Sequence, residues 1–194
     1  TKIEDGSGRH IAVSYNGSGR VMGVSDSANR SASFAYTDDE LTTVTDLDGS
    51  QTNYTYDASS RMTGVDYANG AHKTIAYDSQ NRAVSVTENL DNNKQTFEYN
   101  EVSSRTVMTD ALGNKTTYYY ITVEGRKEIT RIDDAAGKAT SFAIDENLNR
   151  TAATDALSHT TRMAYDAKGN LISVTDPLGN MTQMSYEPTY NQVT

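Results

Sequence analysis

Side chains that could do chemistry are few and scattered in this 194-residue chain. Its three histidines, His10, His72 and His159, lie far apart, and no motif joins them to a nucleophile or to further metal ligands. The chain has no cysteine, which excludes disulfides, thiolate metal sites and cysteine nucleophiles. We therefore predict that it is not an enzyme and that it has no catalytic residue, no metal site and no bound cofactor.

The acidic side chains are more regular than the histidines. Residues 46–49, Asp-Leu-Asp-Gly, resemble half of a calcium-binding loop, but a complete loop needs further oxygen ligands and a bidentate glutamate at position 12. Asp57, Asp78, Asp145 and Asp166 each directly follow a tyrosine or, at Asp145, an isoleucine. At such a position an Asx turn would satisfy local backbone donors. We expect all of these aspartates to stabilise turns.

Charge and composition restrict the class of protein. The formal net charge is −9 without any cluster of Lys or Arg, so nucleic acid is not expected as a partner. No apolar run approaches the roughly 18 residues that a membrane span needs. Leu, Ile, Val and Phe total only 31 residues, a share typical of disordered chains, but 13 Tyr and 26 Thr beside 2 Pro favour β-strands.

An internal repeat supplies the elements that position these residues. A tyrosine or its replacement, here called the anchor, recurs every 20 to 24 residues and defines eight units. The anchors are Tyr15, Tyr36, Tyr56, Tyr77, Tyr99, Tyr120, Ile144, Tyr165 and Tyr186. A bulky residue stands two positions before each anchor, as Phe34 does before Tyr36, which places both on one face of a strand.

Further positions repeat in the same register. An arginine follows most anchors after five or six residues, and a β-branched residue follows four positions later. A Gly- or Asn-containing turn signal lies about fourteen residues after most anchors. One unit is therefore predicted as strand 61–67, turn 68–70, strand 71–77 and turn 78–81. The whole chain is predicted to be all-β, a continuous antiparallel meander of hairpins of about 21 residues without any helix.

Two repeated sets of side chains leave alternatives open. The aromatic residues can pack across neighbouring strands, or they can form a stacking platform for sugars. The recurrent arginines, Arg61, Arg82, Arg105, Arg126 and Arg150, can pair with turn carboxylates or bind anions. We expect the packing role for the aromatic residues and the pairing role for the arginines.

These repeats resemble a known family. Residues 56–62 (Tyr-Asp-Ala-Ser-Ser-Arg-Met), 77–82 (Tyr-Asp-Ser-Gln-Asn-Arg) and 165–171 (Tyr-Asp-Ala-Lys-Gly-Asn-Leu) are similar to the YD repeats of the Rhs family. The resemblance covers residues 11–190. Several units replace the Asp, one unit has Ile144 for Tyr, and the core motif that ends the toxin shells of the family, with its self-cleavage site, has no counterpart.

The resemblance implies a spiralling β-sheet that forms a hollow shell. In bacterial Rhs toxins and Tc complexes this shell encloses a toxic C-terminal domain, and a related shell occurs in teneurins. We therefore expect residues 1–194 to be a single array of about eight repeats from a larger exported shell, secreted or at the cell surface. A surface adhesion module that binds carbohydrate or protein is the alternative.

The expected partners follow from this interpretation. They are other repeats of the same protein and an enclosed polypeptide cargo. The isolated fragment is also expected to self-associate through its edge strands, near residues 11–15 and 181–186.

Overall fold

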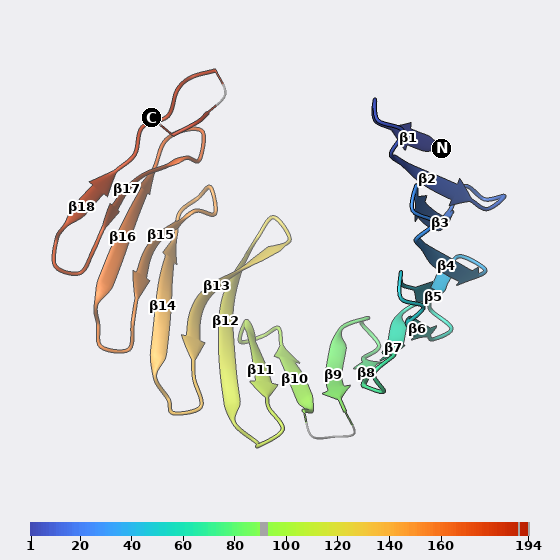
Figure 1. Ribbon diagram of the computed structural model, residues 1–194. Helices are drawn as coiled ribbons and strands as arrows, with labels where there is room; N and C mark the ends of the chain where they lie inside the picture. Colours follow the sequence, from blue (N-terminus) through green and yellow to red (C-terminus); the bar gives the residue numbers. More distant parts are fainter. Residues whose placement is uncertain (90–92, 190, 194) are drawn as a thin grey trace. The chain divides into compact units, whose positions relative to one another are not determined.

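The computed structural model describes residues 1–89, 93–189 and 191–193, and within them it contains strands and turns but no helix. All strand pairings are antiparallel, and successive strands of the chain pair with one another (Figure 1). The predicted all-β fold of tandem hairpins is therefore confirmed. Within the described residues, no helix long and apolar enough to cross a membrane occurs.

The chain divides into two compact units, Thr1–Thr96 and Phe97–Thr194, and the division falls within β10 (Gln95–Asn100). The first unit contains β1 (Lys2–Glu4), β2 (His10–Tyr15), β3 (Val21–Asp26), β4 (Ser31–Thr37), β5 (Glu40–Thr45), β6 (Gln51–Tyr56), β7 (Met62–Asp66), β8 (His72–Tyr77) and β9 (Ala83–Glu88). The second contains β11 (Arg105–Thr109), β12 (Lys115–Val123), β13 (Arg126–Asp133), β14 (Ala139–Ile144), β15 (Arg150–Thr154), β16 (Thr160–Tyr165), β17 (Leu171–Thr175) and β18 (Met181–Gln183). The array predicted over residues 1–194 includes positions 90–92, 190 and 194, which lie outside the described residues.

The strands form because bulky and small residues alternate with a period of two. In β4, Ala32, Phe34 and Tyr36 are half-buried, whereas the intervening Ser33 and Ala35 are exposed. The strands are shorter than predicted: the expected strands 61–67 and 71–77 are Met62–Asp66 and His72–Tyr77. The reason is that the loops between strands take in Arg61, Tyr67 and Ala71, whose backbone groups close the loops.

The sheet is a single layer. Val65, 6% exposed, and Tyr120, 7% exposed, are the only buried hydrophobic side chains among the described residues. The accessible surface is 13011 Å², against about 9,100 Å² for a compact monomer of this mass. Stability must therefore come from contacts between neighbouring strands, as in other repeat proteins.

A β-bulge stands beside most anchors. In the hairpin of β6 and β7, Thr55 opposes Gly64 but Tyr56 opposes Met62, which leaves Thr63 as an extra residue on one strand. The same shift occurs at Ser14/Tyr15, Ala35/Tyr36, Ala76/Tyr77, Tyr119/Tyr120, Ala143/Ile144 and Ala164/Tyr165. Each bulge changes the pairing register directly before the anchor residue.

Candidate functional site

The anchor tyrosines bridge the places where backbone pairing between hairpins stops. Between β5 and β6 the paired residues end at Thr43 and Asn53, short of Tyr56. The Tyr56 hydroxyl instead donates to the carbonyl oxygen of Leu41 on β5, at 2.9 Å. Equivalent bonds join Tyr77 to Met62, at 2.7 Å, Tyr165 to Arg150, at 3.1 Å, and Tyr186 to Leu171, at 3.1 Å. We call Tyr56, Tyr77, Tyr165 and Tyr186 the tyrosine seam.

The hydroxyls of the seam must be protonated to donate. Burial, with the nearby charge of Glu40 as the second cause, raises the pKa of the Tyr56 phenol above its ordinary value. The hydroxyl therefore remains a donor at neutral pH. Each acceptor carbonyl belongs to the residue that opposes the preceding anchor, as Leu41 opposes Tyr36, so the seam links one repeat to the next.

The remaining anchors have other environments. Tyr36 is half-buried with the guanidinium of Arg20 over its ring, 5.6 Å from the centroid. Tyr99 is also half-buried, whereas Tyr15, on β2, is 48% exposed. The assignment of all eight tyrosines, with Arg61 and Arg82, as structural repeat anchors stays a prediction that substitutions can test.

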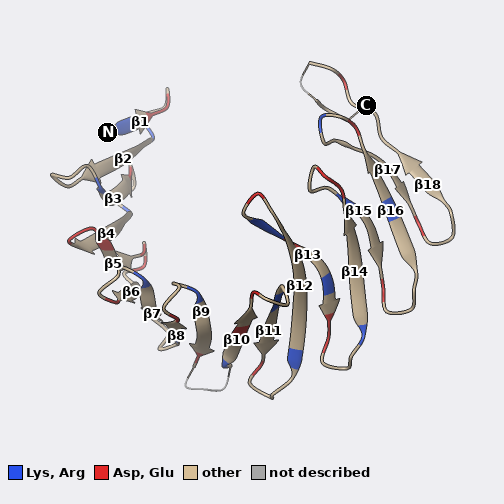
Figure 2. Cartoon of the chain, turned by 180° about the vertical axis from the view of Figure 1, so that it is seen from behind, with Lys and Arg blue, Asp and Glu red and all other residues tan. Residues whose placement is uncertain are grey.

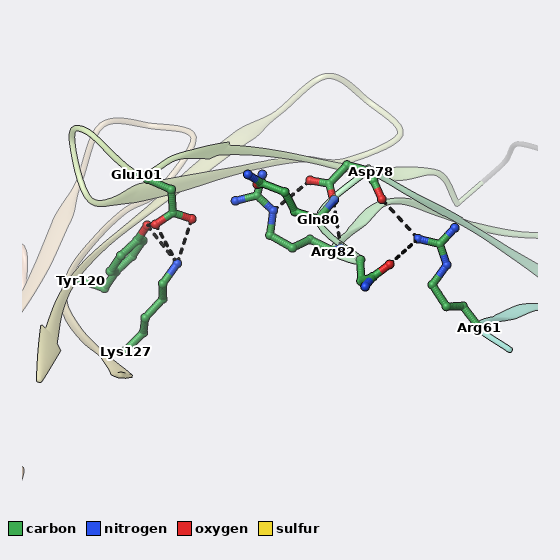
Figure 3. A network of polar contacts seen from close by, with 8 residues as sticks. Arg61, Asp78, Gln80, Arg82, Glu101, Tyr120 and Lys127 are labelled. Carbon is green, nitrogen blue, oxygen red and sulfur yellow. Dashed lines mark hydrogen bonds and ion pairs between the residues drawn. The ribbon is translucent and has the colours of Figure 1, made fainter. Parts of the chain in front are cut away.

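Tyr120 forms a polar cluster in place of the seam bond (Figure 3). Its hydroxyl donates to Glu101 at 2.9 Å, and the Lys127 ammonium lies 3.0 Å from both Glu101 oxygens. The Lys127 ammonium also lies 4.4 Å from the centroid of the Tyr120 ring. The Glu101 carboxylate, followed by the Tyr120 hydroxyl, raises the pKa of Lys127, so this cluster holds a charged lysine rather than a catalytic base.

Loops at both ends of the strands share one backbone geometry. We call those that follow an anchor the anchor loops and those at the opposite strand ends the far loops. In the anchor loop 57–61, the Asp57 amide donates to the Arg61 carbonyl, and Asp57 Oδ1 accepts from the amides of Ser59 and Arg61. The far loop 176–180 repeats these bonds with Asp176, Leu178 and Asn180. The expected turn-stabilising role of Asp57 is thus an Asx-type cap.

The fifth loop residue completes this cap by donating to the second aspartate oxygen. Arginine uses Nε, asparagine uses Nδ2, and histidine uses Nδ1. The pairs are Asp5–Arg9, Asp26–Arg30, Asp57–Arg61, Asp78–Arg82, Asp110–Asn114, Asp145–Asn149, Asp155–His159, Asp166–Asn170 and Asp176–Asn180. Asp78 and Asp145, expected from sequence to lie in turns, have this role.

These bonds lower the pKa of the loop carboxyls. The Arg61 side chain is the largest cause for Asp57, the Arg82 backbone amide for Asp78, and the Asn180 side chain for Asp176. Each of these donors prefers the ionised carboxylate. The carboxyls are thus held in the charged form by hydrogen bonds from their own loops.

Arg61 extends its loop toward the next repeat (Figure 3). It pairs with Asp57, donates from Nη1 to the Asp78 carbonyl at 3.2 Å and to Asn81 Oδ1 at 2.9 Å, and lies 4.8 Å from the centroid of the Tyr77 ring. Arg82 pairs with Asp78 at 2.8 Å. Among the alternatives for these two arginines, the geometry supports pairing with turn carboxylates.

The other recurrent arginines depart from this expectation. Arg105 has a buried Nε without a hydrogen-bond partner among the described residues, because Asn100 replaces the aspartate of its loop. Arg150 lies 3.8 Å from the centroid of the Phe142 ring, because Asn149 already binds Asp145. Arg126 pairs with Glu128, at 3.0 Å, two residues along its own strand. The expected pairing with a turn carboxylate was therefore wrong for Arg105, Arg126 and Arg150.

The candidate chemical residues remain apart. His10 and His72 begin β2 and β8, and His159 ends a far loop. In residues 46–49, Asp46 Oδ1 accepts from the Leu47 amide and Asp48 Oδ1 from the Ser50 amide. Across residues 1–89, 93–189 and 191–193, no group of three or more His, Cys, Asp or Glu could hold a metal ion.

Sequence reasoning missed the bulges and the seam bonds. One signal was present: Met62 and Val65 are three residues apart although both lie on the apolar face, and a regular strand would place them two or four apart. A bulge between them explains that spacing. The seam acceptors carry no signal, because any residue supplies a carbonyl.

Fold and contacts together define a tandem β-hairpin repeat protein whose polar side chains form hydrogen bonds within loops and between strands. Three segments, residues 36–72, 145–181 and 165–194, match the family model described as RHS Repeat. These segments are thus RHS repeats, and the resemblance of the chain to the YD repeats is confirmed. No curated protein matches the chain.

Solved structures share the fold at low sequence identity. A TcdB2-TccC3-Cdc42 crystal structure is 15% identical with a TM-score of 0.59, and covers 95% of this chain and 12% of that one. TcdB2-TccC3 without its hypervariable C-terminal region is 14% identical with a TM-score of 0.59, covering 99% and 13%. The Photorhabdus luminescens Tc holotoxin pore is 13% identical with a TM-score of 0.50, covering 96% and 10%. The chain spans between about a tenth and an eighth of these longer chains.

Proposed function

We propose that this chain is a scaffold segment of an Rhs/YD-repeat shell that encloses a toxin or other C-terminal cargo domain in an exported bacterial protein. Residues 1–194 form one array of about eight repeats in this proposal. The observation that carries it is that the polar side chains bind other parts of the sheet. Loop carboxylates accept hydrogen bonds from their own loops, and seam hydroxyls donate to neighbouring strands.

The mechanism is enclosure, without a catalytic step. A wall must hold its strands together without a second layer, because its two faces are the inside and the outside of the chamber. The seam meets this need, since Tyr77 closes the gap between β7 and β8 by a hydrogen bond and by packing under Arg61. Neighbouring repeats then stabilise one another in series.

The family supports the remaining parts of the proposal. The RHS match and the fold shared with TcdB2-TccC3 support a repeat scaffold within a much longer polypeptide. By the same resemblance, the partners are further repeats of the same protein and an enclosed polypeptide, and the location is outside the cytoplasm of the producing bacterium.

Limited proteolysis of the complete protein tests enclosure. The complete wild-type protein and its Tyr77→Ala and Tyr165→Ala variants are digested with a non-specific protease, and fragments are followed by mass spectrometry. We expect the segment after the repeats to resist cleavage in the wild type and to be cut in the variants. Equal, rapid cleavage of that segment in all three proteins would contradict enclosure.

A glycan array with the same wild-type protein separates the scaffold from the adhesion alternative. The structure supports packing of the aromatic residues, since Phe34, Tyr54 and Phe97 are half-buried within the sheet. We expect no saturable binding. Selective glycan binding that is lost on substitution of the aromatic residues would favour the adhesion module.

A further inference from the structure

One groove in the second unit collects two residues that break the repeat pattern. It has a volume of about 420 Å³ and lies at two successive far loops, 155–159 and 176–180, and the adjoining ends of β16 and β17. Its lining includes Ser158, His159, Thr160, Arg162 and Thr175.

Arg162 is unusual for its position. It stands three residues before the anchor Tyr165, and the equivalent residues in the other units are Ala12, Ser33, Asn53, Thr74, Thr96, Thr117, Ser141 and Gln183. All of these are uncharged. Arg162 is exposed, and its guanidinium forms no ion pair or hydrogen bond with any residue of the described part of the chain. A guanidinium thus stands free where the repeat otherwise has a small or neutral side chain.

His159 is unusual in its loop. The fifth residue of the other capped far loops is arginine, asparagine, serine or lysine, as at Arg30, Ser50, Asn114 and Lys138. His159 Nδ1 lies 3.0 Å from Asp155 Oδ2, which leaves Nε2 without a hydrogen-bond partner among the described residues. The two departures from the repeat therefore occur in the same unit and line the same groove.

Two carboxylates, Asp176 in the lining of the groove and Asp155 beside it, already accept hydrogen bonds from their own loops. Asp155 accepts from the amides of Leu157 and His159, and Asp176 accepts from Leu178 and Asn180. Neither carboxylate lies within 4.0 Å of the Arg162 nitrogens as an ion pair. The hydroxyls of Ser158 and Thr175 add neutral donors to the groove.

We propose that this groove binds a tetrahedral oxyanion, the phosphate or sulfate group of a ligand. Arg162 donates the charged hydrogen bonds and the hydroxyls add neutral ones. His159 Nε2, which is an acceptor because Nδ1 donates to Asp155, binds the P–OH group of a hydrogenphosphate. Guanidinium groups are well suited to oxyanions because their donors form a planar fork. The ligand class is independent of the proposed shell, since the groove requires only the fold of the second unit.

NMR titration of the whole 194-residue chain tests this site. Inorganic phosphate and inorganic sulfate are added in separate arms, with chloride holding the ionic strength constant. We expect saturable shifts of the Arg162 Nε–H and of amides in residues 158–162 and 175–179, with a dissociation constant of about 1–10 mM for an open, singly charged site. The arm with the tighter constant identifies the preferred anion.

Three variants make the test specific. Arg162→Gln removes the guanidinium, His159→Asn restores an amide like Asn180, which keeps the loop bond to the aspartate, and Lys168→Gln removes one positive charge elsewhere in the unit. We expect phosphate binding to be about tenfold weaker for Arg162→Gln, about threefold weaker for His159→Asn, and unchanged for Lys168→Gln. Shifts spread over the whole chain, an unchanged affinity in either groove variant, or an equal loss in the lysine control would overturn the proposal.

Discussion

The anchor loops and the far loops have the same backbone but differ in how they meet their neighbours. On the anchor side, Arg20 pairs with Asp39 at 2.7 Å, and Arg61 binds Asn81 of the next anchor loop. Asn170 and Asn191 exchange hydrogen bonds in the same way. In the described far loops, side-chain bonds such as Asp26–Arg30 close within one loop.

This difference shows that capping of a loop by its aspartate is separable from side-chain contact with the next repeat. Asp26 and Asp57 both bind an arginine four residues later, so both loops are capped equally well. Of these two arginines, only Arg61 also reaches a second loop and a neighbouring ring, because the seam bond of Tyr77 brings the adjacent strands together there. Coupling between repeats is thus concentrated at one end of the strands.

Acid should weaken the aspartate caps that the anchor loops and the far loops share. The carboxyls of Asp57 and Asp26 have pKa values lowered from 3.8, chiefly by the side chains of Arg61 and Arg30. A lowered folded-state pKa adds stability that is present above the unfolded value and is lost as pH falls through the folded value. We expect urea midpoints that are constant between about pH 7 and pH 5 and fall steeply below about pH 4. Midpoints that stay constant down to pH 2 would mean that the caps do not contribute.

Loss of a seam ring should be the most damaging single change. Tyr77→Ala removes a half-buried ring, its bond to the Met62 carbonyl and its contact with Arg61, at a cost of about 3 kcal/mol. Lys73→Ala, on the same strand, removes a partly exposed ion pair with Glu88 and should cost less than about 1 kcal/mol. Tyr15→Ala, at an exposed anchor, is a second control. Similar urea midpoints for all three variants would show that the seam has no special role.

Arginine substitutions compare the two loop types directly. Arg61→Gln should destabilise by about 1–2 kcal/mol, because it removes bonds to two loops and a ring contact. Arg30→Gln, which loses only its own loop cap, should cost less than about 0.5 kcal/mol. Thermal denaturation of both variants gives this difference. An equal loss would place coupling at both ends of the strands.

The hydroxyl and the ring of the seam can be separated by a smaller change. Tyr77→Phe keeps the packing beneath Arg61 but leaves the Met62 carbonyl without its donor, which should cost about 1 kcal/mol. The same substitution at Tyr36, where the Arg20 guanidinium lies over the ring, should be nearly neutral. A neutral Tyr77→Phe variant would assign the seam's contribution to the ring alone.

The last comparison concerns two strand glycines, Gly64 and Gly23, which face the residue before an anchor on the neighbouring strand. A Cβ at Gly64 would lie 2.5 Å from Thr55 Oγ1, whereas one at Gly23 would lie 3.1 Å from Ser14 Oγ. Gly64→Ala should therefore be destabilising by about 1 kcal/mol and Gly23→Ala close to neutral, because a short serine yields more easily. The reverse order in a urea melt would show that the bulge, rather than the facing side chain, limits this position.

Sequence periodicity predicted the part of the fold that depends on side-chain type. The pair Phe34 and Tyr36 gave the period of two, and Asp57 and Asp78 gave the loop caps. It did not predict that the far loop 67–71 would fold alike, since Tyr67 replaces the aspartate there. In that loop Asn69 Oδ1 accepts from the Ala71 amide instead.

The contacts that couple repeats were harder to predict for a physical reason. Arg61 binds a backbone carbonyl at Asp78 and an asparagine at residue 81, and neither partner differs in type from many other residues. The groove beside Arg162 was missed as well, although its signal was visible. Aligning the units on their anchors shows Arg162 as the charged residue in an otherwise neutral column.

The β12–β13 hairpin has a consequence for how such a protein can change over time. It is lengthened beyond the usual unit, with Val123 pairing with Arg126 near its tip, yet Arg131 resumes regular pairing with Ser141 on the next strand. Extra residues are accommodated by outward growth of one hairpin, and the register of its neighbour is undisturbed. Lengthening of a unit is thus a local event, and a gene for such an array can acquire residues in one hairpin while the neighbouring hairpin keeps its own pairing.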